Sequence, residues 1–218
     1  MNAVYPIPLI SKLITQLHDA KYFTKLDVCW GFNNVWIHDG DEWKAAFCTN
    51  HGLFKPQVMF FGLMNSPATF QMMMNDVFQD MMVEGVVCIY LYDILIFTKM
   101  LSKHWNIVQR VLEHLQEHKL YLKPEKCEFE WKQIEYLGVI VSEGLVEMDP
   151  VKVSGIAEWP IPWNKREVQS FVGFINFYWR FIKDFPHHAC ALFDLTKKDV
   201  KWKWEESEHF CPSPHLSR

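Results

Sequence analysis

The chain has 218 residues, of which 50% are hydrophobic and 16% are aromatic, and its formal net charge is −4. This length and apolar content suffice to bury a core, which excludes an intrinsically disordered chain. The acidic balance is unfavourable for a protein that holds phosphate backbones, so composition alone argues weakly against nucleic acid. Arginine, the bidentate phosphate ligand, is scarce and occurs only at Arg110, Arg166, Arg180 and Arg218.

Neither a membrane span nor a signal peptide is expected. The longest apolar stretch, from Val86 to Phe97, contains Asp93 and is shorter than the roughly 20 residues that cross a bilayer. No basic segment precedes an apolar one at the start of the sequence. The cysteines are scattered without a C-x-x-C pair, which predicts free thiols in a reducing compartment and neither a disulfide framework nor a zinc cluster.

The first part of the sequence predicts strands followed by a helix and a hairpin. The β-rich runs 24–28, 34–38 and 43–49 are expected to be strands, with a turn at Gly31. Asn65-Ser66-Pro67 predicts a helix start with Ser66 as the N-cap, leading into residues 70–82. The apolar runs 86–90 and 94–97 predict a buried hairpin with Asp93 near its tip.

A helix and two more strands are expected next. One apolar face recurs between residues 103 and 119, which predicts a helix, and residues 127–131 and 134–142 follow as strands. The character of the sequence changes after Gly144, so we divide the chain into residues 1–143, a helical part over residues 144–210 and a disordered tail over residues 211–218.

Two helix starts are predicted in the helical part. They lie at Asp149-Pro150 and at Asn164 to Glu167, the second with the spacing of a capping box. The helix from Glu167 to Ile182 is expected to pack an apolar stripe against the β-rich part of the chain.

Asp27 and Asp93 are the candidate catalytic and metal-binding residues. Each lies beside β-rich apolar sequence, where an unpaired carboxylate is costly. Phosphoryl transfer with two metal ions requires carboxylates that converge from different strands, and Mg²⁺ favours one or two carboxylates together with substrate phosphates. The structural alternatives are a turn-capping role for Asp27 at Gly31 and an ordinary hairpin-tip position for Asp93.

Several ordered motifs resemble the Pol polyprotein of gypsy-type LTR retrotransposons. They are Tyr5–Pro8, Leu26–Phe32, Phe61–Gln71, Tyr136–Gly138 and Val168–Phe174, and the resemblance extends from Tyr5 to about Phe210. It implies an α+β fold: a reverse-transcriptase palm, with an antiparallel sheet and packed helices, followed by a thumb and connection part. The fingers segment that the family has before Tyr5 is not included, so the fingers are expected to be truncated. The implied activity is RNA-directed DNA polymerisation.

The resemblance also implies roles for individual residues. Asp27 would ligate both metal ions, and Phe32 would be the aromatic gate that excludes a ribose 2′-hydroxyl. Gly62 would line the nucleotide site. Lys126 would lie near the incoming triphosphate, with a solvated loop lysine as the alternative. The residues expected to contact nucleic acid are Phe61, Asn65, Gln71 and the primer-grip pair Leu137 and Gly138.

The cofactor and partners follow from the same resemblance. The expected ion is Mg²⁺, with Mn²⁺ as its substitute. The expected partners are an RNA/DNA primer-template, a deoxynucleoside triphosphate and a second Pol chain, and a membrane is not among them. The family implies a cytoplasmic location in a virus-like particle, with the nucleus as the alternative.

Tyr92 departs from the family pattern. At residues 90–93 the family has a tyrosine, any residue and two aspartates, so Tyr92 replaces the carboxylate that would share the metal ions with Asp27. A phenol with a pKa near 10 is neutral at pH 7 and a weak ligand. Asp93, the next residue, is expected to point to the face of the strand opposite to that of Tyr92. We therefore expect a catalytically inactive copy, with an active polymerase or a non-catalytic nucleic-acid-binding module as alternatives.

A second departure concerns the scarce arginines. The family usually has arginine at the positions of Cys29, Trp36, Cys48 and Trp179, and threonine at the position of Met64. Each change can arise from a C-to-T transition in a CG dinucleotide. This suggests a pseudogene fragment from a methylated repeat that decays without selection, and neutral drift of surface positions is the alternative.

Overall fold

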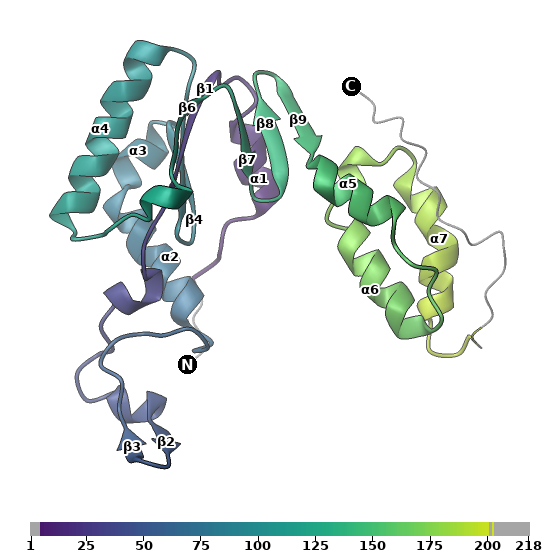
Figure 1. Ribbon diagram of the computed structural model, residues 1–218, viewed down its shortest axis with the longest axis horizontal. Coiled ribbons are helices and arrows are strands. Elements are labelled where there is room, and N and C mark those ends of the chain that lie inside the picture. Colours follow the sequence, from purple (N-terminus) through teal and green to yellow (C-terminus); the bar gives the residue numbers. More distant parts are fainter. Residues whose placement is uncertain (1–4, 201, 203–218) are drawn as a thin grey trace. The chain divides into compact units, whose positions relative to one another are not determined.

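The computed structural model describes residues 5–200 and Trp202, and these form two compact units (Figure 1). The chain divides between Val146 and Glu147, three residues after the predicted boundary. The difference arises because Gly144 leads into one more strand, β9 (Leu145–Met148), which the sequence analysis did not include. The predicted tail over residues 211–218 lies outside the described residues. Within the described part of the chain, no helix is both long and apolar enough to cross a membrane.

Over its described residues, 5–146, the first unit contains four helices, short 3₁₀ turns and three small sheets, the last of which ends in β9 across the unit boundary. Its helices are α1 (Ile10–Gln16), α2 (Ser66–Val77), α3 (Gln79–Val83) and α4 (Leu101–Glu117). Its 3₁₀ turns are η1 (Gly31–Asn34), η2 (Glu42–Ala45) and η3 (Pro124–Lys126). Its strands are β1 (Tyr22–Asp27), β2 (Phe47–Thr49), β3 (Gly52–Phe54), β4 (Val87–Tyr90), β5 (Asp93–Thr98), β6 (Glu128–Trp131), β7 (Gln133–Tyr136), β8 (Val139–Ser142) and β9.

The central sheet has the antiparallel strand order β4-β5-β1-β6. The predicted hairpin is confirmed as β4 and β5, and its strands are almost entirely buried. Helices α2 and α4 contribute Phe70, Met74, Val108 and Val111 to the core that covers Leu26 and its neighbours on the sheet. Leu112, an apolar residue within the helix predicted over residues 103–119, is 38% exposed. The sheet and its helices form the α+β architecture expected for a palm.

The strand predicted at residues 34–38 is wrong. The segment forms the turn η1 and then a single bridge between Trp36 and Val58. The reason is a side-chain hydrogen bond: Asn34 Nδ2 donates to Cys29 O at 3.1 Å and closes the turn locally. Residues 43–49 likewise begin as η2 and pair as a strand only from Phe47 onward.

Helix α2 begins at Ser66, so the predicted N-cap position is displaced by one residue to Asn65. The Ser66 side chain is buried and its Oγ donates to Phe60 O at 3.4 Å, so it is not available as a cap. The predicted helix over residues 70–82 also divides at Phe78 into α2 and α3.

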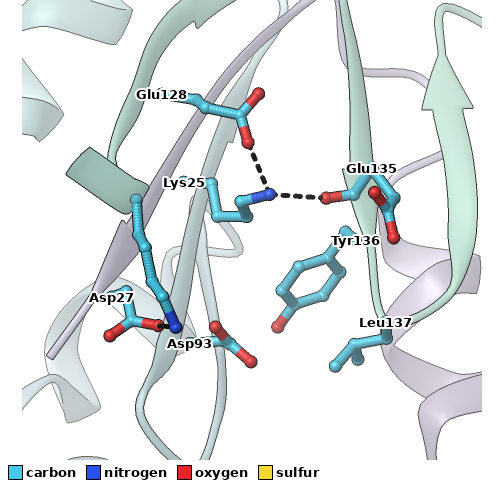
Figure 2. A pocket seen from close by; sticks show the side chains of 8 residues that line it. Lys25, Asp27, Asp93, Glu128, Glu135, Tyr136 and Leu137 are labelled. Carbon is cyan, nitrogen blue, oxygen red and sulfur yellow. Dashed lines mark hydrogen bonds and ion pairs between the residues drawn. The ribbon is translucent and has the colours of Figure 1, made fainter. Parts of the chain in front are cut away.

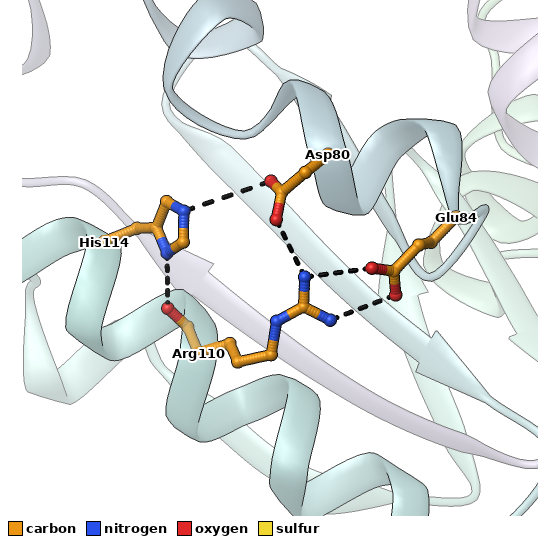
Figure 3. Close-up of polar contacts among 4 residues, drawn as sticks. All are labelled: Asp80, Glu84, Arg110 and His114. Carbon is orange, nitrogen blue, oxygen red and sulfur yellow. Dashed lines mark hydrogen bonds and ion pairs between the residues drawn. The ribbon is translucent and has the colours of Figure 1, made fainter.

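Arg110 on α4 holds α3 in place (Figure 3). Its guanidinium donates two hydrogen bonds to Glu84, both at 3.0 Å, and one to Asp80 at 2.7 Å. His114, one turn further along α4, donates a hydrogen bond from Nδ1 to Arg110 O at 2.9 Å. A planar fork suits this bidentate pairing, so the scarce arginine here has a structural role.

The second unit contains the helices α5 (Pro150–Ala157), α6 (Lys165–Ile175) and α7 (Phe185–Thr196), and the turn η4 (Trp179–Phe181). Both predicted caps are confirmed: Asp149 accepts from Val151 N, and Asn164 accepts from Glu167 N. Helix α6 ends at Ile175, seven residues before the predicted end. Its apolar stripe is buried among residues of its own unit, including Ile156 and Leu192.

Candidate active site

Asp27 and Asp93 are direct cross-strand partners, at the end of β1 and the beginning of β5. Opposite residues of an antiparallel pair point to the same face of the sheet. Both side chains therefore line one cavity of ≈ 360 Å³ (Figure 2). The expectation that Asp93 points away from Asp27 is wrong, because the turn at Leu91 and Tyr92 resets the alternation that was counted along the strand. The other lining residues are Lys25, Lys126, Glu128, Glu135, Tyr136 and Leu137.

The Asp27 carboxylate is buried between two lysines. Its Oδ1 lies 3.3 Å from Lys123 Nζ, and its Oδ2 lies 3.6 Å from Lys126 Nζ. Oδ1 is fully buried and makes no hydrogen bond, so the contact with Lys123 is an ion pair. The backbone reinforces this contact, since Lys123 N donates to Asp27 O at 3.0 Å. The Asp27 side chain raises the pKa of the Lys123 ammonium.

The Asp93 carboxylate has the opposite electrostatic tendency. Burial raises its pKa, and the neighbouring charge of Asp27 raises it further. Lys25, Lys126 and Lys123 act against this shift without cancelling it. A buried carboxylate whose proton affinity is raised by a neighbouring carboxylate is stabilised in its ionised form by a cation.

Lys25, on the same face of β1 as Asp27, and Tyr136 on β7 also line the cavity. Lys25 Nζ forms an ion pair with Glu128 Oε1 and donates to Glu135 O at 3.1 Å (Figure 2). The Tyr136 hydroxyl accepts a contact from Cys88 Sγ at 3.7 Å. Burial raises the pKa of Cys88 to about 12, so this thiol is a neutral packing group. These contacts tie β7 to the central sheet next to the carboxylates.

Tyr92 occupies the third position of the motif. Its carbonyl oxygen accepts from Val28 N at 2.9 Å, and its side chain is 41% exposed. A Cβ on Gly31 would lie 3.6 Å from the Cβ of Tyr92, so the phenol starts beside the turn that follows Asp27. Next to it, Phe32 packs edge-on against Phe70, with ring centroids 5.7 Å apart.

The cavity brings together four of the predicted site residues: Asp27, Asp93, Lys126 and Leu137. Its lining does not include Phe32, Phe61, Gly62, Asn65 or Gly138. Gly62 has a φ of +135°, and Leu137 and Gly138 form the β7–β8 turn with φ of +51° and +79°.

Gln71, predicted to contact nucleic acid, is fully buried, so that prediction is wrong for its side chain. Its amide bonds to the hairpin backbone: Nε2 donates to Ile89 O, and Oε1 accepts from Leu91 N.

Three residues at the site, Lys25, Lys123 and Tyr136, were not predicted from the sequence. Lys25 could have been found, because it lies two residues before Asp27 on the same strand face. Lys123 and Tyr136 reach the site only through contacts that are distant in sequence, since Leu122 bridges Val28 and Tyr136 lies on β7.

The matching family model is described as reverse transcriptase (RNA-dependent DNA polymerase), and it covers residues 2–141. The chain belongs to the reverse transcriptase family. Among its relatives are two transposon polyproteins. It is 34% identical over 205 residues to the Transposon Tf2-3 polyprotein of Schizosaccharomyces pombe, covering 94% of this chain and 15% of the polyprotein. It is 37% identical over 194 residues to the Retrovirus-related Pol polyprotein from transposon opus of Drosophila melanogaster, covering 88% and 19%.

Solved structures share the fold of this reverse transcriptase domain. The foamy viral protease-reverse transcriptase in complex with an RNA/DNA hybrid matches with a TM-score of 0.83 at 22% identity, over 93% of this chain and 28% of that chain. A second structure of the foamy viral enzyme, in complex with double-stranded DNA, has a TM-score of 0.83 at 24% identity, over 92% and 37%. The chain spans less than a fifth of the two polyproteins and resembles them in its gypsy-type reverse transcriptase part.

The donor set fits one hard divalent cation. Asp27 and Asp93 offer carboxylate oxygens on one face, and Asp27 Oδ1 is a buried oxygen without a hydrogen bond. Mg²⁺ and Mn²⁺ prefer such ligands when substrate phosphates complete the coordination. Among residues 5–200, no group of three or more His, Cys, Asp or Glu side chains is arranged around one metal position.

Proposed function

We propose that this reverse transcriptase domain holds a primer-template and one divalent ion but does not carry out nucleotidyl transfer. The observation that carries the proposal is the facing pair of Asp27 and Asp93 in one cavity, with Tyr92 in the position of the third carboxylate. When bound, the metal ion would neutralise phosphate charge. Lys126 would contribute a further positive charge to a triphosphate, because its side chain is 58% exposed and can leave Asp27.

The absence of a carboxylate charge at Tyr92 accounts for the proposed lack of nucleotidyl transfer. Phosphoryl transfer depends on positioning and on charge stabilisation by metal ions, and two ions act together on the attacking and leaving oxygens. A neutral phenol at Tyr92 provides no charge for a second ion. Each 1.36 kcal/mol of lost transition-state stabilisation lowers the rate about tenfold, so the loss of one ion's contribution of several kcal/mol removes measurable turnover.

We infer nucleic-acid binding from the family. The related foamy viral enzyme forms complexes with an RNA/DNA hybrid and with double-stranded DNA. In this chain we assign the first unit to the palm and the second to the thumb and connection. Phe32 would retain the role of a sugar gate, because its ring is fixed against Phe70 next to the Asp27 turn.

Primer extension together with binding tests the proposal. A labelled DNA primer on an RNA template is incubated with the chain and one deoxynucleotide, with Mg²⁺ or Mn²⁺, and a retroviral reverse transcriptase validates the assay. We expect no extension by the unmodified chain, by Asp27→Asn or by Tyr92→Asp. Tyr92→Asp restores a carboxylate, but the basic side chains that the family uses for phosphates remain scarce. Extension that Asp27→Asn abolishes would establish an active polymerase and overturn the proposal.

Binding is measured separately by fluorescence anisotropy of the same duplex. We expect an affinity that falls steeply with salt, as phosphate contacts require. Absence of binding at low salt would remove the nucleic-acid part of the proposal.

A further inference from the structure

We propose that Tyr5, Asn75 and Gln71 form a hydrogen-bonded relay that positions the active-site hairpin, with Gln71 as its positioning residue. The inference goes beyond the proposed function. It gives Gln71, which the sequence had assigned to nucleic acid, a different role.

The side-chain amide of Gln71 makes three hydrogen bonds in the core. Its side chain is on α2 and is fully buried. Its Oε1 accepts from Leu91 N at 2.8 Å, and its Nε2 donates to Ile89 O at 3.3 Å and to Asn75 Oδ1 at 2.8 Å. A buried amide that lost these partners would be costly, so the arrangement fixes the side chain strongly. The two backbone partners lie on β4, which is the edge strand of the central sheet among the described residues, and in the turn that follows it.

The direction of every bond in the relay is determined. A backbone N–H can only donate, so Leu91 N fixes Oε1 of Gln71 as the atom that faces it. The Gln71 amide nitrogen must then face Asn75, which requires Oδ1 there. The Asn75 nitrogen is left to donate to Tyr5 Oη, at 2.7 Å. The relay thus connects residues 5, 71, 75 and 91 with one consistent polarity.

The relay ends at a strained position. Leu91 has a φ of +54°, in the left-handed region that residues with a Cβ avoid. Such a conformation persists only where the surroundings over-determine it. Gln71 provides this restraint by accepting from the N–H of Leu91 itself. The same turn determines which face of the sheet Asp93 occupies, since Asp93 begins the following strand.

The inferred role is therefore positional. Without the relay, Leu91 would relax toward ordinary backbone angles, and the register that pairs Asp93 with Asp27 would loosen. The consequence for metal binding rests on the proposed function. The effect on the hairpin backbone does not, and it can be measured without a ligand.

Amide hydrogen exchange by NMR on the full chain tests the relay. In Gln71→Leu, which keeps an apolar shape in the core, we expect the Leu91 amide to exchange at least about tenfold faster, because its acceptor is gone. The amide of Leu95, in the middle of β5, should be unchanged. Urea unfolding of the same sample separates this local effect from a general loss of stability.

Two further variants keep the inference testable if Gln71→Leu does not fold. Tyr5→Phe removes only the hydroxyl at the far end of the relay, and we expect a smaller acceleration at Leu91, about threefold. Tyr121→Phe is the matched control, since Tyr121 is 72% exposed and should leave Leu91 unchanged. Gln71→Leu combined with Leu91→Gly should show a smaller opening of the turn than Gln71→Leu alone, because glycine tolerates positive φ.

The outcomes are separable. Unchanged exchange at Leu91 in both Tyr5→Phe and Gln71→Leu would overturn the relay. A uniform rise at Leu91 and Leu95 would show that Gln71 contributes only to global stability, and would equally overturn it. Failure of the chain to bind Mn²⁺ or a primer-template would overturn the proposed function and leave the relay standing.

Discussion

Lys123 Nζ lies 3.3 Å from a buried oxygen of Asp27 that makes no hydrogen bond. The lysine thus provides the positive charge that the carboxylate needs when no metal ion is bound. A divalent cation that uses this oxygen has to displace the ammonium, so Lys123 and the metal compete for one position.

Replacing Lys123 should therefore strengthen metal binding. In Lys123→Met we expect the affinity for Mn²⁺ to rise about three- to tenfold, the scale of one charge-assisted contact. Mn²⁺ titration followed by electron paramagnetic resonance measures this affinity. Lys21→Met is the control, because Lys21 pairs with Glu143 outside the candidate site. Weaker or unchanged Mn²⁺ binding in Lys123→Met would show that the lysine supports the site and does not compete for it.

The pH dependence of metal binding should report on Asp93. Its pKa is raised, so its proton competes with a cation up to a higher pH than the proton of an ordinary aspartate does. We expect Mn²⁺ affinity to increase as pH rises through the pKa of Asp93, and to flatten above it. In Asp93→Asn the affinity should be lower and this pH dependence should be lost. An identical pH profile in the two proteins would place the titrating group elsewhere.

His104 should make the first unit sensitive to acid. The ring is fully buried between Thr24 Oγ1 at 2.8 Å and Thr98 Oγ1 at 3.0 Å. Thr98 donates to Met100 O, so it accepts from Nδ1–H of His104. In this neutral tautomer Nε2 accepts from the Thr24 hydroxyl, which itself accepts from Glu130 N. A second ring proton, on Nε2, would break the hydrogen bond that Thr24 donates. Burial lowers the pKa of His104, and Glu130 only partly opposes this effect.

The stability of the first unit should fall as pH falls, because folding and protonation of His104 are linked. The folded pKa of His104 is below the unfolded value, so its contribution to stability is complete above about pH 6.5 and is lost as pH falls toward the folded pKa. The slope contributed by this one group is at most about 1.4 kcal/mol per pH unit, the limit set by one proton. Urea unfolding of the chain and of His104→Gln between pH 5 and 7 gives the difference in slope, which removes the contribution of the other histidines. Equal slopes would contradict the network.

Much of the fold was predictable because it depends on local chemistry. The caps Asp149 and Asn164 bond within three residues of themselves, and the hairpin of β4 and β5 follows from two apolar runs. The strand at residues 34–38 failed because the side chain of Asn34 closes a turn that periodicity does not reveal. The apolar stripe of α6 was recognised as a buried face, but the periodic pattern does not show which element covers such a face.

The candidate site could likewise be predicted from the sequence only in part. Asp27 was identified from its place at the end of a strand. The orientation of Asp93 and the role of Gln71 depend on one left-handed residue, Leu91, and on contacts 18 to 20 residues apart. The positions that depart from the family's arginines and threonine are mostly at the surface: Trp36, Cys48, Met64 and Trp179 are exposed, and Cys29 is half-buried. Decay of an unselected repeat and drift at surface positions both predict this distribution.

The number of Mn²⁺ ions bound tests the central claim most directly. The chain, a primer-template and a non-hydrolysable deoxynucleotide analogue are titrated with Mn²⁺, and free ion is counted by electron paramagnetic resonance. The pair of Asp27 and Asp93 predicts one bound ion per chain, and none in Asp27→Asn. Tyr92→Asp, which adds a third carboxylate beside the turn, should bind two. Two ions bound by the unmodified chain would contradict the account, because Tyr92 would then not prevent a second metal ion from binding.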